Sequence, residues 1–143
     1  PESSHKNIQY IKADLMTTQN FKKTDSLSCL HAIEHFGMGR YGDKIDVEGH
    51  IKGINNLVNL VHDGGLLYIS FPIGFADQVH FNAHRVFHPH TILSVDSIAR
   101  EMVLLRFDYV DDNGNLHQDV SIDDAIDTVK YGCGIYTFKK NIH

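Results

Sequence analysis

Residues 66–71 read Leu66-Leu67-Tyr68-Ile69-Ser70-Phe71, a nearly continuous apolar run that stops at Pro72. Such a run is typical of a strand buried on both faces, as in the centre of a parallel sheet. Upstream, apolar residues at helical spacing predict a helix that begins near Asp46 and ends at Gly64-Gly65. These apolar residues are Ile51, Ile54, Leu57, Val58 and Val61. A helix that leads into a buried strand is the repeating unit of an α/β fold.

Further elements are predicted on both sides of this unit. Short runs rich in β-branched and aromatic residues predict strands at 8–12, 26–30, 102–110 and 135–138. Helices are predicted at about 91–100 and 121–130, and Ser121 with Asp124 resembles a capping box at the start of the second. Helical crossovers between buried strands predict a mostly parallel sheet within a single domain, residues 1–143.

The composition is that of an ordinary globular protein, with 143 residues of which 42% are hydrophobic and 22% charged. The formal charge is -5 and no long basic run occurs, so nucleic acid is not an expected partner. No apolar run approaches the length of a membrane span. Cys29 and Cys133 lie in strand-like stretches and are expected to be free thiols, which favours a reducing compartment and a cytoplasmic location.

Polar residues follow three of the predicted strands, where ligands bind in open α/β sheets. The Asp14 carboxylate could accept a hydrogen bond from a purine amino group, or it could cap a turn. Arg40, Tyr41 and Asp43 place a cation, a phenol and a carboxylate on a glycine-rich loop. They could bind a sugar or a phosphate, or they could form a surface turn.

Histidines cluster in two places. The segment His31-Ala32-Ile33-Glu34-His35 matches the H-x-x-E-H pattern of some zinc proteases, which requires a helix. A predicted strand before it and glycines after it favour a strand-to-loop edge that lines a cleft. In the second cluster, alternation would place His80, Asn82 and His84 on one side of an extended segment. These residues could bind a divalent metal or supply a general base, and the lack of carboxylates at fixed spacing favours a polar site without metal.

Three strings in the chain resemble the signature of domain-of-unknown-function family 268, which is methyltransferase-like. They are Ser28-Cys29-Leu30-His31-Ala32-Ile33-Glu34-His35-Phe36-Gly37-Met38-Gly39-Arg40-Tyr41-Gly42-Asp43, Phe71-Pro72-Ile73-Gly74 and Phe81-Asn82-Ala83-His84-Arg85-Val86-Phe87. Asp14 after a strand, and His62-Asp63-Gly64-Gly65-Leu66 before one, also resemble the second half of a class I, Rossmann-like methyltransferase. The resemblance implies S-adenosylmethionine as the cofactor and a small molecule or a glycan as the methyl acceptor.

The resemblance also implies roles for individual residues. Asp14 and Leu15 would flank the adenine, and His31 would line the methyl-donor pocket. Two groups would face the acceptor in one cleft: Glu34, His35, Arg40, Tyr41 and Asp43 after one strand, and Asn82, His84 and Arg85 after another. His84 or His35 would take the acceptor proton, and Glu34 or Asp43 would orient that base.

The chain departs from the methyltransferase pattern at its start. The glycine-rich loop after the first strand, and the acidic residue that ends the second, have no counterpart before Ile8. The first βαβ portion is therefore expected to be absent. Either an upstream segment completes the cofactor site, or the chain is a non-catalytic relic that binds a partner or a sugar nucleotide. A metal-dependent hydrolase that uses the histidines is a third hypothesis.

Overall fold

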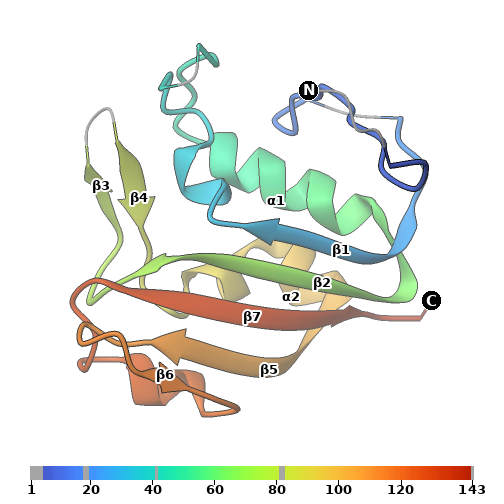
Figure 1. The fold of residues 1–143 in the computed structure, drawn as a ribbon. Coiled ribbons are helices and arrows are strands. Elements are labelled where there is room, and N and C mark those ends of the chain that lie inside the picture. Colours follow the sequence, from blue (N-terminus) through green and yellow to red (C-terminus); the bar gives the residue numbers. More distant parts are fainter. Residues whose placement is uncertain (1–4, 18–19, 41, 81–82, 143) are drawn as a thin grey trace.

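The computed structural model describes residues 5–17, 20–40, 42–80 and 83–142 (Figure 1). The strands are β1 (Thr24–Leu30), β2 (Val61–Ile73), β3 (Gln78–His80), β4 (His84–Val86), β5 (Met102–Val110), β6 (Leu116–His117) and β7 (Gly132–Lys140). The helices are α1 (Gly49–Asn59) and α2 (Asp96–Glu101), with short 3-10 turns η1 (Ile33–His35), η2 (Thr91–Ser94) and η3 (Ile122–Ala125). Among these residues no helix is long and apolar enough to cross a membrane.

The main sheet is mixed, with strand order β1-β2-β7-β5-β6. Only β1 and β2 pair in parallel, whereas β7 is antiparallel to both β2 and β5, and β6 is antiparallel to β5. The prediction of a mostly parallel sheet was therefore wrong. The segment between β5 and β7 holds only β6 and the single turn η3, so β7 returns antiparallel because no crossover helix carries the chain back.

The strand predicted at residues 8–12 does not form. Ile8, Tyr10 and Ile11 are each more than half exposed, so this short segment has neither a paired edge nor a buried face to stabilise it. The residues that follow it are fixed by α1 instead, because the Asn56 side-chain amide donates to the carbonyl of Leu15 at 2.8 Å.

The helices are shorter than predicted. Helix α1 ends at Asn59, and Val61, which is fully buried, already belongs to β2 opposite Thr24. The helix predicted at 91–100 is divided into η2 and α2, and the one predicted at 121–130 is only the turn η3. The capping box of Ser121 and Asp124 is confirmed. Cys29 and Cys133 are free thiols on β1 and β7, as predicted.

Helices α1 and α2 pack together on one face of the sheet, and this contact forms the core (Figure 1). Alternate residues of β2 point into it, namely Leu67, Ile69, Phe71 and Ile73, and they meet Ile54 and Leu57 from α1. This packing fixes the carboxyl ends of β1, β2 and β5 at one end of the sheet, from which the β3–β4 hairpin rises (Figure 1).

The β3–β4 hairpin leaves the main sheet after β2, and the chain segments before and after the hairpin are hydrogen-bonded to each other. The Phe87 amide donates to the Pro72 carbonyl, and the Gly74 amide donates to the Phe87 carbonyl. Within the hairpin, His80 pairs with His84 across the two strands. The expectation of a single extended segment that carries both histidines was therefore wrong, because the chain reverses between them.

Candidate functional site

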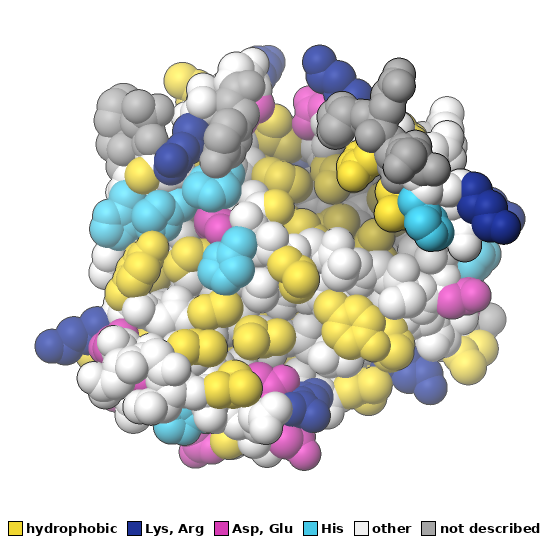
Figure 2. Space-filling model, viewed as in Figure 1, with side chains coloured by type: hydrophobic (Ala, Val, Ile, Leu, Met, Phe, Trp, Pro, Cys, Tyr) yellow, Lys and Arg dark blue, Asp and Glu magenta, His cyan; other side chains and the backbone are white. Residues whose placement is uncertain are grey.

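A cavity of about 330 Å³ lies where β1, β2 and β5 end and β7 begins. We call it the histidine cavity, and its lining residues are His31, Glu34, His35, Pro72, His84, Val110, Asp111, Tyr131, Gly132 and Cys133. Figure 2 shows histidine side chains gathered at this end of the molecule. Four residues that the sequence proposed for a site (His31, Glu34, His35 and His84) therefore meet in one cavity.

Glu34 is the buried acid of this cavity, because the fully buried Ile33 beside it fixes η1 in the core. Its side chain is 3% exposed, and its Oε1 atom lies 3.4 Å from Nδ1 of His31 and 3.8 Å from Nε2 of His35. Its Oε2 atom is buried without a hydrogen-bond partner. A buried carboxylate is costly unless it is paired, so the two imidazole rings are held where a proton on either one would lie next to Glu34.

His31 connects Glu34 to Cys133. Its backbone adopts a positive φ of 49°, an uncommon conformation for a residue with a side chain, directly after β1 ends. Its Nε2 atom lies 3.1 Å from Sγ of Cys133. Burial, followed by the charge of Glu34, raises the pKa of Cys133. The cysteine is thus a thiol at neutral pH, and its S–H donates to the Gly134 carbonyl at 3.7 Å while His31 Nε2 contacts the sulfur and His31 Nδ1 faces Glu34.

His35 and His84 form the side of the cavity next to the hairpin. His35 Nδ1 lies 2.8 Å from the carbonyl oxygen of Ala83, so this nitrogen donates and Nε2 faces Glu34. His84 Nε2 lies 3.0 Å from the Tyr131 hydroxyl. Burial lowers the pKa of His84, and the charges of His80 and His35 lower it further. His84 is therefore neutral at pH 7, as a proton acceptor must be.

Of the predicted acceptor residues in the loop after η1, Arg40 ties the loop to the hairpin and Asp43 closes the loop on itself. Arg40 donates to the Ala83 carbonyl at 3.2 Å, the same oxygen that His35 contacts, and Asp43 accepts from the Gly39 amide at 3.2 Å. Neither side chain lines the histidine cavity. Two other predicted acceptor residues, Tyr41 and Asn82, lie outside the described residues.

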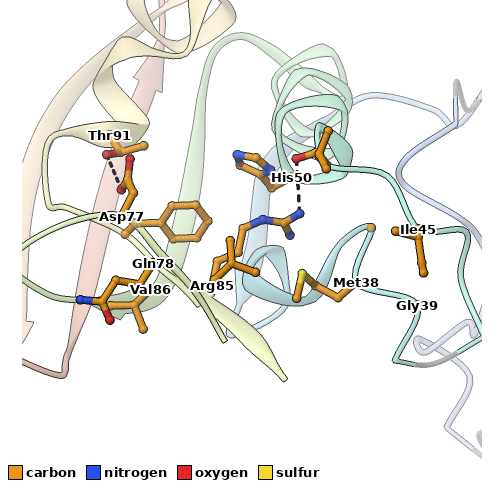
Figure 3. Close-up of a pocket in the computed structure, with 13 residues that line it drawn as sticks. Met38, Gly39, Ile45, His50, Asp77, Gln78, Arg85, Val86 and Thr91 are labelled. Carbon is orange, nitrogen blue, oxygen red and sulfur yellow. Dashed lines mark hydrogen bonds between the residues drawn. The ribbon is translucent and has the colours of Figure 1, made fainter. Parts of the chain in front are cut away.

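Arg85 faces a different cavity from His84. Successive residues of a strand point to opposite faces, and β4 places His84 in the histidine cavity and Arg85 in a larger one of about 530 Å³ (Figure 3). The expectation that both would face the same cleft was therefore wrong. We call this second space the apolar cavity, and the glycine-rich loop, α1 and the hairpin enclose it.

Asp14 and Leu15 line neither cavity. Oδ1 of Asp14 accepts from the Met16 amide at 2.9 Å, which is the turn-capping role that the sequence left open. The Leu15 side chain is half-buried against the core. Their contact with an adenine ring stays a prediction.

Sequence reasoning missed three polar side chains of the histidine cavity. Tyr131 and Cys133 come from the start of β7, and Asp111 follows β5. Asp111 is held by Nε2 of His117 at 2.9 Å, and this contact keeps the pKa of its carboxyl well below the usual range. Only a Cys between two glycines (residues 132–134) marked this segment in the sequence. Within the described parts of the chain, no three His, Cys, Asp or Glu residues are grouped to hold a metal ion.

A family model matches residues 3–126; it is that of DUF268, described as a Caenorhabditis protein of unknown function. The chain belongs to the DUF268 family. This confirms the family resemblance that residues 28–43, 71–74 and 81–87 carry. No curated protein matches the DUF268 chain.

Two solved structures resemble the DUF268 chain. One is the N-methyltransferase NodS from Bradyrhizobium japonicum WM9 in complex with S-adenosylhomocysteine (TM-score 0.53, 12% identity), and the alignment covers 90% of this chain and 52% of NodS. The other is the [4+2]-cyclase SpnF (TM-score 0.60, 11% identity), where the coverage is 92% and 56%. The DUF268 chain thus has an α/β fold similar to the Rossmann-like folds of methyltransferases, and it spans about half of each matched chain. A methyltransferase and a cyclase share this fold, so the fold alone does not select a reaction.

Proposed function

We propose that the DUF268 chain contributes the acceptor side of an S-adenosylmethionine-dependent methyltransferase whose substrate is a small molecule or a glycan. The observation that carries this proposal is the convergence of His31, Glu34, His35 and His84 on one cavity at the carboxyl ends of the strands. In α/β folds this end of the sheet is where ligands bind. The likeness of the fold to NodS, which was solved with S-adenosylhomocysteine, supports the choice of cofactor.

The exposure of the residues that we assign to the cofactor supports that role. The His31 side chain is 53% exposed at the end of β1, while its two ring nitrogens contact Glu34 and Cys133. The Asp14 carboxylate is exposed as well, and Leu15 is half-buried beside it. We assign His31 to the methyl-donor side and Asp14 with Leu15 to the adenine. When bound, S-adenosylmethionine supplies a methyl group already activated on a sulfonium, so the protein contributes positioning and a base.

His84 is the proposed base. In the free protein the Tyr131 hydroxyl lies at hydrogen-bond distance from Nε2 of His84, and an acceptor hydroxyl or amine that enters the cavity can take that place. The neutral imidazole then accepts the acceptor proton. Glu34 acts on this base through His35. Glu34 lies beside His35, and the His35 ring packs edge-on to His84 with centroids 6.2 Å apart.

A test of this function is methyl transfer from radiolabelled S-adenosylmethionine to pools of small hydroxylated metabolites and oligosaccharides. We expect His84→Ala to lower the rate by about 10²- to 10⁴-fold, with the affinity for S-adenosylhomocysteine unchanged. His62→Ala is the matched control, since His62 is exposed on β2 outside the cavity, and it should leave the rate unchanged. Equal turnover by His84→Ala and the unmodified protein would remove His84 from the mechanism.

A non-catalytic module that binds a partner or a sugar nucleotide is the second candidate. The likeness to SpnF supports this second candidate, because SpnF is named as a cyclase and the fold is therefore not limited to proteins named as methyltransferases. The two candidates differ in one measurable property: a methyltransferase binds S-adenosylhomocysteine, and a module of this kind does not.

A further inference from the structure

The apolar cavity contains a buried cation that forms no salt bridge with any described residue, and Asp46 acts on it only from a distance. Arg85 is 5% exposed, and its guanidinium donates to the backbone carbonyls of Phe36 and Val47. Across residues 5–17, 20–40, 42–80 and 83–142, no carboxylate lies within 4 Å of it. A guanidinium has five N–H donors, and two of them are used in these contacts. Buried charges are normally paired, so this one is arranged to receive an anion.

The rest of the cavity wall is largely apolar. It is formed by Met38, Ile45, Val47, Val79, Val86 and Phe87. The volume of about 530 Å³ lies within the range of small-molecule sites, about 300–1,000 Å³. A few polar groups in a mostly apolar hollow are the usual composition of a ligand site.

His50 supplies a second polar group on the same wall. Its ring comes from α1 and lies near the Arg85 side chain in Figure 3. Its Nδ1 atom is buried and makes no well-formed hydrogen bond. Nδ1 has no exposed surface, so His50 contributes its ring to the wall, and Arg85 is the group that would meet a ligand.

Asp77 limits the charge of the ligand. It lines the same cavity, and its Oδ1 atom accepts a hydrogen bond from the Thr91 hydroxyl at 2.7 Å (Figure 3). The same atom accepts from the His88 amide at 2.7 Å. A carboxylate fixed in the wall repels a ligand with several negative charges more than one with a single charge. The wall therefore favours a monoanion.

We propose that the apolar cavity binds a small, mostly apolar molecule with a single carboxylate, which is held by Arg85 while the apolar part contacts Val79, Val86 and Phe87. This site is separate from the histidine cavity, because the two share no lining residue. The proposal therefore does not depend on methyl transfer.

The probe for this proposal is octanoate, compared with 1-octanol and octyl phosphate by calorimetric titration and by amide chemical-shift mapping. We expect one octanoate per chain, with shifts confined to the lining of the apolar cavity and with binding at least about tenfold tighter than that of 1-octanol. Equal binding of octanoate and octanol, or shifts elsewhere, would overturn the proposal. Tighter binding of octyl phosphate would overturn the choice of a carboxylate.

Substitution of Arg85 itself would leave two carbonyls without donors and could unfold the loop. Val79→Glu avoids this problem, since Val79 is 65% exposed and lies directly opposite Arg85 in the hairpin register. Residues opposite each other in an antiparallel pair share a face, so the new carboxylate would form an ion pair with Arg85 and compete with the carboxylate of the ligand. We expect octanoate affinity to fall at least about tenfold in Val79→Glu, and to stay unchanged in the control Val103→Glu on β5. Unchanged affinity in Val79→Glu would contradict the role of Arg85.

Discussion

Substitution of His50 by Phe should change how the stability of the protein depends on pH. Burial, followed by the nearby charge of Arg85, lowers the pKa of His50 to about 4, although Asp77 and Asp46 act in the opposite direction. The ring packs against Phe87 with centroids 5.6 Å apart, so a phenyl group of similar shape can replace it.

The sign follows from the two pKa values of His50. The pKa of a histidine in the unfolded chain is about 6.5, above the folded value of about 4. Between these values the unfolded chain takes up a proton that the folded chain does not, so the free energy of unfolding decreases as the pH falls from 6.5 toward 4. The full difference corresponds to about 3 kcal/mol. Solvent screening at this partly exposed ring reduces it to about 2 kcal/mol.

The assay is urea unfolding followed by far-ultraviolet circular dichroism at pH 7.5 and at pH 4.5, since the chain has no Trp to report by fluorescence. We expect the stability of His50→Phe, relative to the unmodified protein, to be about 2 kcal/mol higher at pH 4.5 than at pH 7.5. His62→Phe, at an exposed position, should show no such change. The same pH dependence in His50→Phe and the unmodified protein would refute the reasoning.

Three more substitutions test other contacts. Glu34→Gln should lower the pKa of Cys133, because a charge that raises it is removed, and should speed alkylation of that thiol by iodoacetamide at pH 8.5; an unchanged rate would argue against the coupling. Gly37→Ala should lose more than about 2 kcal/mol in urea unfolding, since φ is +72° and a Cβ would lie 1.9 Å from the Asp46 carbonyl oxygen. Tyr136→Phe removes a buried hydrogen bond of 2.8 Å and should cost about 1–2 kcal/mol, which thermal unfolding would detect.

The sequence predicted elements well where one physical signal dominated. The apolar run at 66–71 lies within β2, the run at 102–110 matches β5, and Ser121 with Asp124 forms its capping box. The failures came where the outcome depended on distant partners. Residues 8–12 have strand propensity, but in the structure they have no neighbouring strand to pair with, and the direction of β7 depends on what connects it to β5.

The sequence predicted those residues of the site that come directly after a predicted strand in the chain. His31, Glu34 and His35 directly follow β1, so their place at the end of the sheet could be deduced from the chain order. Tyr131 and Cys133 could not be placed there, because they lie at the start of the antiparallel β7 and reach the cavity only through its reversed direction. The sequence could not show that His84 and Arg85 line different cavities, because this depends on which elements cover each face of the hairpin.

The most direct test of the central claim is a calorimetric titration of S-adenosylhomocysteine into the protein expressed from its native start codon. The account predicts one site per chain with a Kd in the micromolar range, competed by S-adenosylmethionine and retained in His84→Ala. No heat of binding at millimolar S-adenosylhomocysteine, from protein that unfolds cooperatively, would contradict the methyltransferase proposal and would favour the non-catalytic binding module.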